Sequence, residues 1–245
     1  MIHHWIWRVP VAIVALWCAA CGELPGRPSP SSVPIDPDYI SDFNVLFSKN
    51  CSGCHGANGQ NGPALPIADP VYLAIADDAL LHKVVTNGIA GTSMPAFAQS
   101  AGGMLTDRQV DIIVRGLREH YAKPNALAGS TAPPYAATES GDAQRGAVVY
   151  QTFCASCHGA DGKGSPKGSS IVDGSFLALL TDQELRTLVI IGRPDLGAPD
   201  WRNNVPGKAM SSQEISDVVA WLSARRPHFP GSPYLNASRS TGEHP

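Results

Sequence analysis

The chain of 245 residues repeats itself, and this repeat limits the folds that are open to it. Residues 83–97 (KVVTNGIAGTSMPAF) align without gaps on residues 187–201 (TLVIIGRPDLGAPDW) at a constant offset of 104. Two turn-forming residues and one aromatic residue recur in register: Gly88 with Gly192, Pro95 with Pro199, and Phe97 with Trp201. The pattern indicates a tandem duplication of one small domain.

Each copy of the repeat contains one peptide of the form Cys-x-x-Cys-His. The residues concerned are Cys51, Cys54 and His55 in the first copy, and Cys154, Cys157 and His158 in the second. This motif is typical of covalent haem attachment. The two thiols bond to the porphyrin, and the adjacent histidine is placed under the iron as an axial ligand. The sequence therefore predicts two haem c groups.

Two other uses of paired cysteines fit the sequence less well. A zinc site built from two Cys-x-x-Cys pairs usually has them within about 20 residues of each other, whereas these pairs lie 103 residues apart. A thioredoxin-like redox pair would lie in a βαβ pattern, which the sequence does not show. Neither use explains a histidine directly after the second cysteine in both copies.

The first 20 residues have the form of an export signal. Arg8 ends a short n-region, the apolar run 9–17 is too short to span a bilayer, and small residues precede Cys21. A plain soluble secretory signal is one interpretation. Residues 18–21 (CAAC) also resemble a bacterial lipobox, in which the last cysteine is acylated, although Cys18 stands where leucine is usual.

On either interpretation the haems are exported, and we expect them in the periplasm or otherwise outside the cytoplasmic membrane. If Cys21 is lipidated, it attaches the chain to the membrane. The segment 21–38 is rich in proline and serine, so it would then act as an extended tether.

Amino-acid composition and helix-breaking residues divide the rest of the chain into domains. Residues 122–140 are rich in Pro, Ala, Ser and Thr and lack apolar periodicity, which predicts a linker between domain 1 (39–121) and domain 2 (141–229), with a tail at 230–245. The chain is 43% hydrophobic and 16% charged, with a formal charge of −3. These values argue against disorder and against a nucleic-acid ligand.

Helical periodicity predicts an all-α fold, with a helix before each haem motif and two helices after it. Apolar residues at helical spacing precede the first motif: Tyr39, Phe43, Leu46 and Phe47. The closing helices begin at the capping residues Thr106 and Ser211 or Ser212. Each then carries one apolar face, formed by Val110, Ile113, Val114 and Leu117 in the first copy and by Ile215, Val218, Val219 and Leu222 in the second.

With these motifs and helices, both halves resemble class I cytochrome c domains. The resemblance implies that the first and last helices of each half cross where a glycine meets an aromatic residue. In domain 2 the residues concerned are Gly146, Tyr150 and Trp221. In domain 1 the sizes are exchanged, because Phe43 stands in place of Gly146 and Gly116 in place of Trp221; we expect the exchange to keep the contact volume nearly constant.

The resemblance also implies a proline carbonyl that accepts the N–H of the axial histidine in each domain. The residues that would supply it are Pro63, or Pro66 in its place, and Pro166.

The resemblance further implies a methionine in a Met-Pro turn as the sixth iron ligand. Met94 fits this role in domain 1, the alternative being an ordinary core methionine. Domain 2 departs from the pattern, because Ala198 aligns with Met94. Met210 is a candidate substitute, but it aligns with Leu105, where a packing role is expected. Further alternatives are Lys208, His228 or no protein ligand.

The function expected from this reading is single-electron transfer by a dihaem cytochrome in a bacterial respiratory or related electron-transport chain. Its partners would be redox proteins, namely a donor complex and an acceptor such as an oxidase. One alternative is a haem enzyme or small-ligand sensor with an open iron in domain 2, where Asp200 and Trp201 form either a distal pocket or a cap and a core aromatic. Another is a haem subunit of a larger oxidoreductase complex.

Overall fold

The structure is a computed structural model that describes residues 34–227. The predicted signal (1–20), Cys21 and the tail (230–245) lie outside the described residues. The chain forms two units, residues 1–39 and residues 40–245. The described part of the first unit contains the short 3-10 helix η3 (Pro37–Tyr39). The second unit contains both copies of the repeat.

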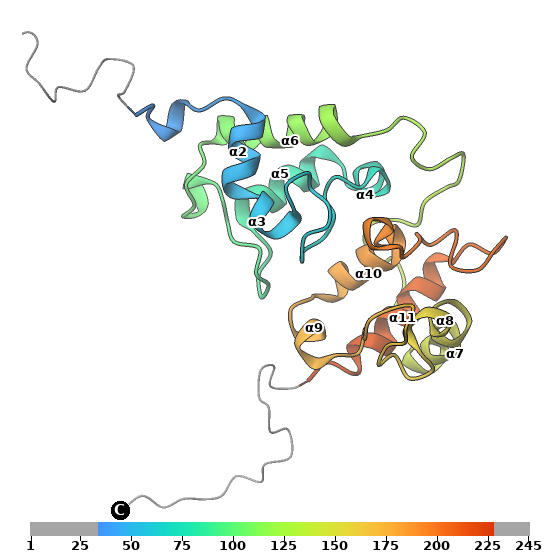
Figure 1. The fold of residues 1–245 in the computed structure, drawn as a ribbon. Coiled ribbons are helices and arrows are strands. Elements are labelled where there is room, and N and C mark those ends of the chain that lie inside the picture. The colour runs from blue at the N-terminus through green and yellow to red at the C-terminus, as the bar shows by residue number, and fades with distance from the viewer. Residues whose placement is uncertain (1–33, 228–245) are drawn as a thin grey trace, which may run out of the picture. The chain divides into compact units, whose positions relative to one another are not determined.

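Both copies have the same order of elements, which Figure 1 shows from blue to red along the chain. The elements of domain 1 are α2 (Phe43–Asn50), α3 (Ser52–His55), α4 (Pro70–Ile75), α5 (Asp78–Asn87), η4 (Gln99–Ala101) and α6 (Asp107–Tyr121). Those of domain 2 are α7 (Ala143–Phe153), α8 (Ala155–His158), α9 (Gly174–Ala178), α10 (Asp182–Ile191), η5 (Pro194–Leu196) and α11 (Ser212–Ser223). Residues 34–227 contain isolated β-bridges but no strand, as expected for an all-α fold.

The opening helix of domain 1 begins later than its periodicity suggests. Tyr39 was expected to share its apolar face, but it lies in η3 and is 73% exposed. The helix begins at Phe43, because the side chain of Asp42 accepts the N–H of Val45 at 2.9 Å and so caps the helix.

The closing helices begin and pack as predicted. Thr106 caps α6 in a capping box with Gln109, and Ser211, rather than Ser212, caps α11 in a capping box with Glu214. Their apolar faces are buried: Val110, Ile113, Val114 and Leu117 on α6, and Ile215, Val218, Val219 and Leu222 on α11. A third capping box, between Thr181 and Glu184, starts α10.

In each domain the opening helix packs against the closing helix, α2 against α6 and α7 against α11. The glycine of α7, Gly146, lies against the backbone of Asp217 and the side chain of Trp221. Tyr150 stacks on Trp221 with ring centroids 4.2 Å apart. In α6 the small residue is Gly116, which lies against Phe43. The predicted exchange of sizes between the two domains is therefore present in the structure.

The second half of the segment 122–140 is bonded to domain 2. The guanidinium of Arg186, a residue only 2% exposed, donates to the carbonyls of Pro134 and Tyr135. It also donates to the hydroxyls of Ser212 and Ser216 on α11. Gln183 donates to the Tyr135 carbonyl at 2.8 Å. This part of the segment is thus an extension of domain 2 rather than a free connection.

Candidate haem-binding sites

Each Cys-x-x-Cys-His motif forms one helical turn directly after a longer helix. In domain 1 the N–H of Cys51 donates to Phe47 O at 2.8 Å, and the N–H of His55 donates to Cys51 O at 3.0 Å. The equivalent bonds in domain 2 join Cys154 to Tyr150 O and His158 to Cys154 O, each at 2.9 Å. The thiols and the histidine of one motif therefore share a single turn, as covalent haem attachment requires.

The four cysteines of the two motifs are free thiols. Cys54 and Cys157 are exposed, whereas their partners are partly covered. Burial is the main cause that raises the pKa of Cys51 to about 11 and that of Cys154 to about 12; the neighbouring thiol of the same motif acts in the same direction.

A backbone carbonyl orients the histidine of each motif, but it does not belong to a proline. Nδ1 of His55 is bonded to Leu65 O at 2.7 Å, and Nδ1 of His158 is bonded to Ser169 O at 2.8 Å. The expectation that Pro63 or Pro66, and Pro166, supply these carbonyls is therefore wrong. The loop after each motif turns so that a residue next to or beyond the proline faces the ring. The bond leaves Nε2 of each histidine as the nitrogen available to a metal.

Burial of His55 lowers the pKa of its imidazole, and the hydrogen bond with Leu65 O acts in the opposite direction. The lowered pKa favours the neutral ring, which is the form that binds a metal. The thiols and histidines of both motifs therefore fit a covalently attached haem.

One backbone hydrogen bond of the loop before the closing helix is common to both domains. The N–H of Ile89 donates to Met94 O at 3.0 Å, and the N–H of Arg193 donates to Ala198 O at 2.9 Å. A glycine with positive φ ends the preceding helix in each case, because a side chain there would strike the backbone of this loop. Ala198 thus occupies the backbone position that Met94 has in domain 1, and it carries no ligating atom.

A second pair of bonds fixes the place of Met210. Its N–H donates to Trp201 O at 2.9 Å, just as the N–H of Leu105 donates to Phe97 O at 2.7 Å. Met210 is 3% exposed and Leu105 is 4% exposed. Met210 therefore has the backbone position and the burial of an apolar residue that directly precedes the N-cap of the closing helix.

The other candidates near this loop are already engaged, as far as the structure describes them. Nζ of Lys208 lies 3.7 Å from Glu214 and 4.8 Å from the ring centre of Phe153. Trp201 is 2% exposed and is a core aromatic. Asp200 forms an ion pair with Arg202 at 2.5 Å. His228 lies outside the described residues.

An ion pair of domain 2 binds the loop that follows the first haem motif. The carboxylate of Asp195, whose side chain is 1% exposed, pairs with Arg193 at 2.8 Å and accepts the N–H of Asn61 at 2.8 Å. Arg193 donates to the carbonyl of Gly62 at 2.9 Å. Sequence reasoning missed this contact, because Arg193 and Asp195 form no motif on their own.

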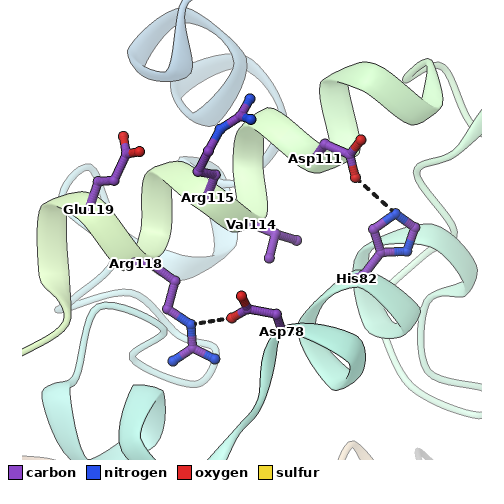
Figure 2. Close-up of a pocket in the computed structure, with 7 residues that line it drawn as sticks. All are labelled: Asp78, His82, Asp111, Val114, Arg115, Arg118 and Glu119. Carbon is purple, nitrogen blue, oxygen red and sulfur yellow. Dashed lines mark hydrogen bonds and ion pairs between the residues drawn. The ribbon is translucent and has the colours of Figure 1, made fainter.

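A groove between α5 and α6 of domain 1 contains none of the predicted site residues. Figure 2 shows its lining, with ion pairs between His82 and Asp111 and between Arg118 and Asp78. Arg118 also donates to the carbonyls of Leu73 and Ala76. These bonds join α4, α5 and α6, so the polar side chains that line the groove have a structural role.

Comparison with known families agrees with this geometry. The profile of the family described as "Cytochrome c" matches residues 143–225, and that of "Cytochrome C oxidase, cbb3-type, subunit III" matches residues 40–115. The chain is a dihaem c-type cytochrome. Each of its two domains implies one covalently attached haem c, and the CxxC motifs are formed by Cys51 and Cys54 in domain 1 and by Cys154 and Cys157 in domain 2.

Curated relatives of this cytochrome are subunits of respiratory complexes. It is 30% identical over 130 residues to the cbb3-type cytochrome c oxidase subunit CcoP of Azospirillum brasilense, which covers 49% of this chain and 39% of the relative. It is 25% identical over 183 residues to the cytochrome bc1 complex cytochrome c subunit of Mycobacterium bovis, which covers 72% of this chain and 60% of the relative. The cytochrome thus spans only 39% and 60% of these relatives' own length.

Among residues 34–227, no helix is both long enough and apolar enough to cross a membrane.

Proposed function

We propose that this cytochrome passes single electrons between redox proteins of a bacterial respiratory chain. The observation that carries the proposal is the repeated motif geometry, in which two thiols and a carbonyl-bound histidine share one helical turn in each domain. The names of the curated relatives, which are cytochrome c subunits of an oxidase and of a bc1 complex, support the same class of function.

The residues have distinct roles in this proposal. His55 and His158 are the axial ligands on one side of each iron, and the carbonyls of Leu65 and Ser169 orient them. Met94 is the sixth ligand in domain 1, where its thioether favours Fe(II) and so raises the reduction potential. The bound haem supplies the Fe(III)/Fe(II) couple.

Location and partners form a second part of the proposal. Residues 1–20 direct export, acylation of Cys21 anchors the chain, and the segment 21–38 holds the domains away from the membrane. The partners are a donor complex and an acceptor such as an oxidase. The formal charge of −3 favours partners with a basic docking face.

The test begins with the number of haems. The alkaline pyridine spectrum of the purified holoprotein should give two haem c groups per chain, and Cys54→Ser and Cys157→Ser should each remove one thioether bond and shift the corresponding haem band. A redox titration should then resolve reversible one-electron steps. Fewer than two haems per chain in the unmodified protein would contradict the proposal.

Met94 is tested separately. Met94→Ala should abolish the methionine–iron charge-transfer band of domain 1 and lower its potential. Met104→Ala is the matched control, because Met104 lies in the same loop but is 75% exposed. If both variants keep the band, Met94 is a packing residue and not a ligand.

A second candidate function is that of a haem subunit within a larger oxidoreductase complex. It is favoured by the relatives, both of which are named as subunits. Purification from membranes in mild detergent separates the two functions: a stable stoichiometric complex identifies a subunit, and a single chain identifies a free carrier.

A further inference from the structure

We propose that the iron of domain 2 has no methionine ligand and takes up a small neutral diatomic molecule, such as carbon monoxide or nitric oxide. The molecule would bind at the coordination position for which domain 1 supplies Met94. This inference rests on the proposed haem attachment in domain 2, at Cys154, Cys157 and His158. It adds a ligand-binding site to the electron carrier.

The first step is that the loop holding Ala198 in domain 2 corresponds to the loop holding Met94 in domain 1. In both domains a helix ends at a glycine with positive φ, the next N–H bonds back to the carbonyl of the ligand position, and a proline follows. Because these bonds coincide, the alignment of Ala198 with Met94 holds in three dimensions. The methyl group of Ala198 has no lone pair to offer an iron.

The second step concerns Met210, the only methionine among the described residues of domain 2. Its side chain is enclosed by protein, and its sulfur lies 3.9 Å from Nδ2 of Asn204. Its counterpart in domain 1 is Leu105, which is equally buried in the domain where Met94 is the proposed ligand. The position therefore has a packing role in both domains, and this role accounts for Met210 without iron.

The third step concerns nitrogen donors. His158 is the only histidine between residues 141 and 227, so the described part of domain 2 has no second imidazole. Lys208 pairs with Glu214. Lys163 pairs with Asp161 at 3.0 Å, and Lys167 lies in the turn whose Gly168 contacts the ring of His158. Both of these lysines thus belong to the loop that holds the first axial ligand.

The consequence follows from the chemistry of the two oxidation states. Carbon monoxide binds Fe(II) by forming one coordination bond, with no electron transferred and no group lost. A ligand that prefers Fe(II) necessarily favours reduction of that iron, because the two equilibria are linked. Ligand uptake would therefore hold an electron on domain 2 and slow its onward transfer.

The experiment titrates the chemically reduced holoprotein with carbon monoxide and follows the haem absorption bands. We expect one carbon monoxide per chain in the reduced protein, and one methionine–iron charge-transfer band from two haems in the oxidised protein. Ala198→Met should abolish the uptake and add a second methionine–iron band. Met210→Leu is the matched control and should change neither result, since leucine occupies this position in domain 1.

Several outcomes would overturn the inference. One is that no carbon monoxide binds and Met210→Leu removes a methionine–iron band, which would make Met210 the ligand. Another is that carbon monoxide binds only to the His228→Ala variant, which would make His228 the ligand. If Ala198→Met yields no holoprotein, the carbon monoxide stoichiometry of the unmodified protein decides by itself. A haem content below two per chain would instead contradict the proposed function, so the two failures are distinguishable.

Discussion

The ring of Phe43 lies directly over the Cα of Gly116, so that a β-carbon placed on Gly116 would be 2.1 Å from Cδ2 of the ring. Domain 2 has the opposite order, because a β-carbon on Gly146 would be 2.8 Å from Cβ of Trp221. Each helix crossing thus combines one residue without a side chain with one large ring. The two domains differ in which helix supplies the ring.

Gly116→Trp should destabilise domain 1. Its indole would compete with Phe43, which also stacks on His120 with ring centroids 4.6 Å apart. Overpacking of this kind costs about 1–3 kcal/mol. Thermal unfolding of the holoprotein measures the effect. The double variant Phe43→Gly with Gly116→Trp reproduces the order of domain 2 and should recover much of the loss; an unchanged melting temperature in the single variant would refute the interpretation.

Asp217→Asn should destabilise domain 2 in a pH-dependent way. The Asp217 side chain is 4% exposed and accepts two bonds from Arg145, each at 2.8 Å. These bonds are the main reason that the pKa of Asp217 lies below its usual range, and burial acts in the opposite direction. A lowered folded-state pKa stabilises the fold above the unfolded value of about 3.9, and this stability is lost as the pH falls through the folded value.

The expected loss in the Asp217→Asn variant is about 2 kcal/mol at pH 7. Denaturant unfolding at pH 7 and at about pH 3 checks both the size and the sign. The difference between variant and unmodified protein should shrink at the lower pH. An equal difference at both values would mean that the charge of Asp217 contributes nothing.

Asp195→Ala should release the loop after the first haem motif. The substitution removes the acceptor of the Asn61 N–H and leaves Arg193 without its carboxylate. A loss of about 1.4 kcal/mol corresponds to a tenfold faster exchange of the Asn61 amide. Hydrogen exchange read by mass spectrometry measures it. Asp161→Ala is the control, because Asp161 pairs only with the exposed Lys163; equal effects of the two substitutions would contradict the prediction.

Arg186→Lys should detach residues 133–140 from domain 2. Lysine cannot reproduce the five donors of the guanidinium, so the carbonyl of Pro134 and the hydroxyls of Ser212 and Ser216 lose their partner. A hydrogen bond from a charged donor contributes about 1.5–3 kcal/mol. Limited proteolysis should then cut within 133–140. Arg225→Lys, at an exposed arginine on the same domain, should leave the cleavage pattern unchanged; resistance in the Arg186→Lys variant would refute this role.

The local features of the fold could be predicted from the sequence. The capping boxes at Thr106 and Ser211 and the apolar faces behind them depend on residues three or four positions apart, and spacing alone reveals them. The alignment of Ala198 with Met94 also holds, because the backbone hydrogen bond to the carbonyl at this position is present in both copies of the repeat.

The contacts that depend on loop paths could not be predicted. The carbonyls of Leu65 and Ser169, rather than those of prolines, face the histidines, because a turn of one residue more or less changes which carbonyl points inward. The role of Arg186 joins residues about 50 positions apart, and no short pattern encodes such a bond. For the same reason composition alone predicted a free linker across residues 133–140.

The exchanged glycine and aromatic residues also bear on how two similar domains fold within one chain. A tandem duplicate offers each opening helix two closing helices, and mispairing between repeats is a common failure of such chains. If α2 met α11, Phe43 and Trp221 would compete for one space; if α7 met α6, Gly146 and Gly116 would leave a gap. Each wrong pairing thus places either two large rings or two glycines at the helix crossing. The arrangement of glycine and aromatic residue therefore favours pairing of each opening helix with the closing helix of its own domain.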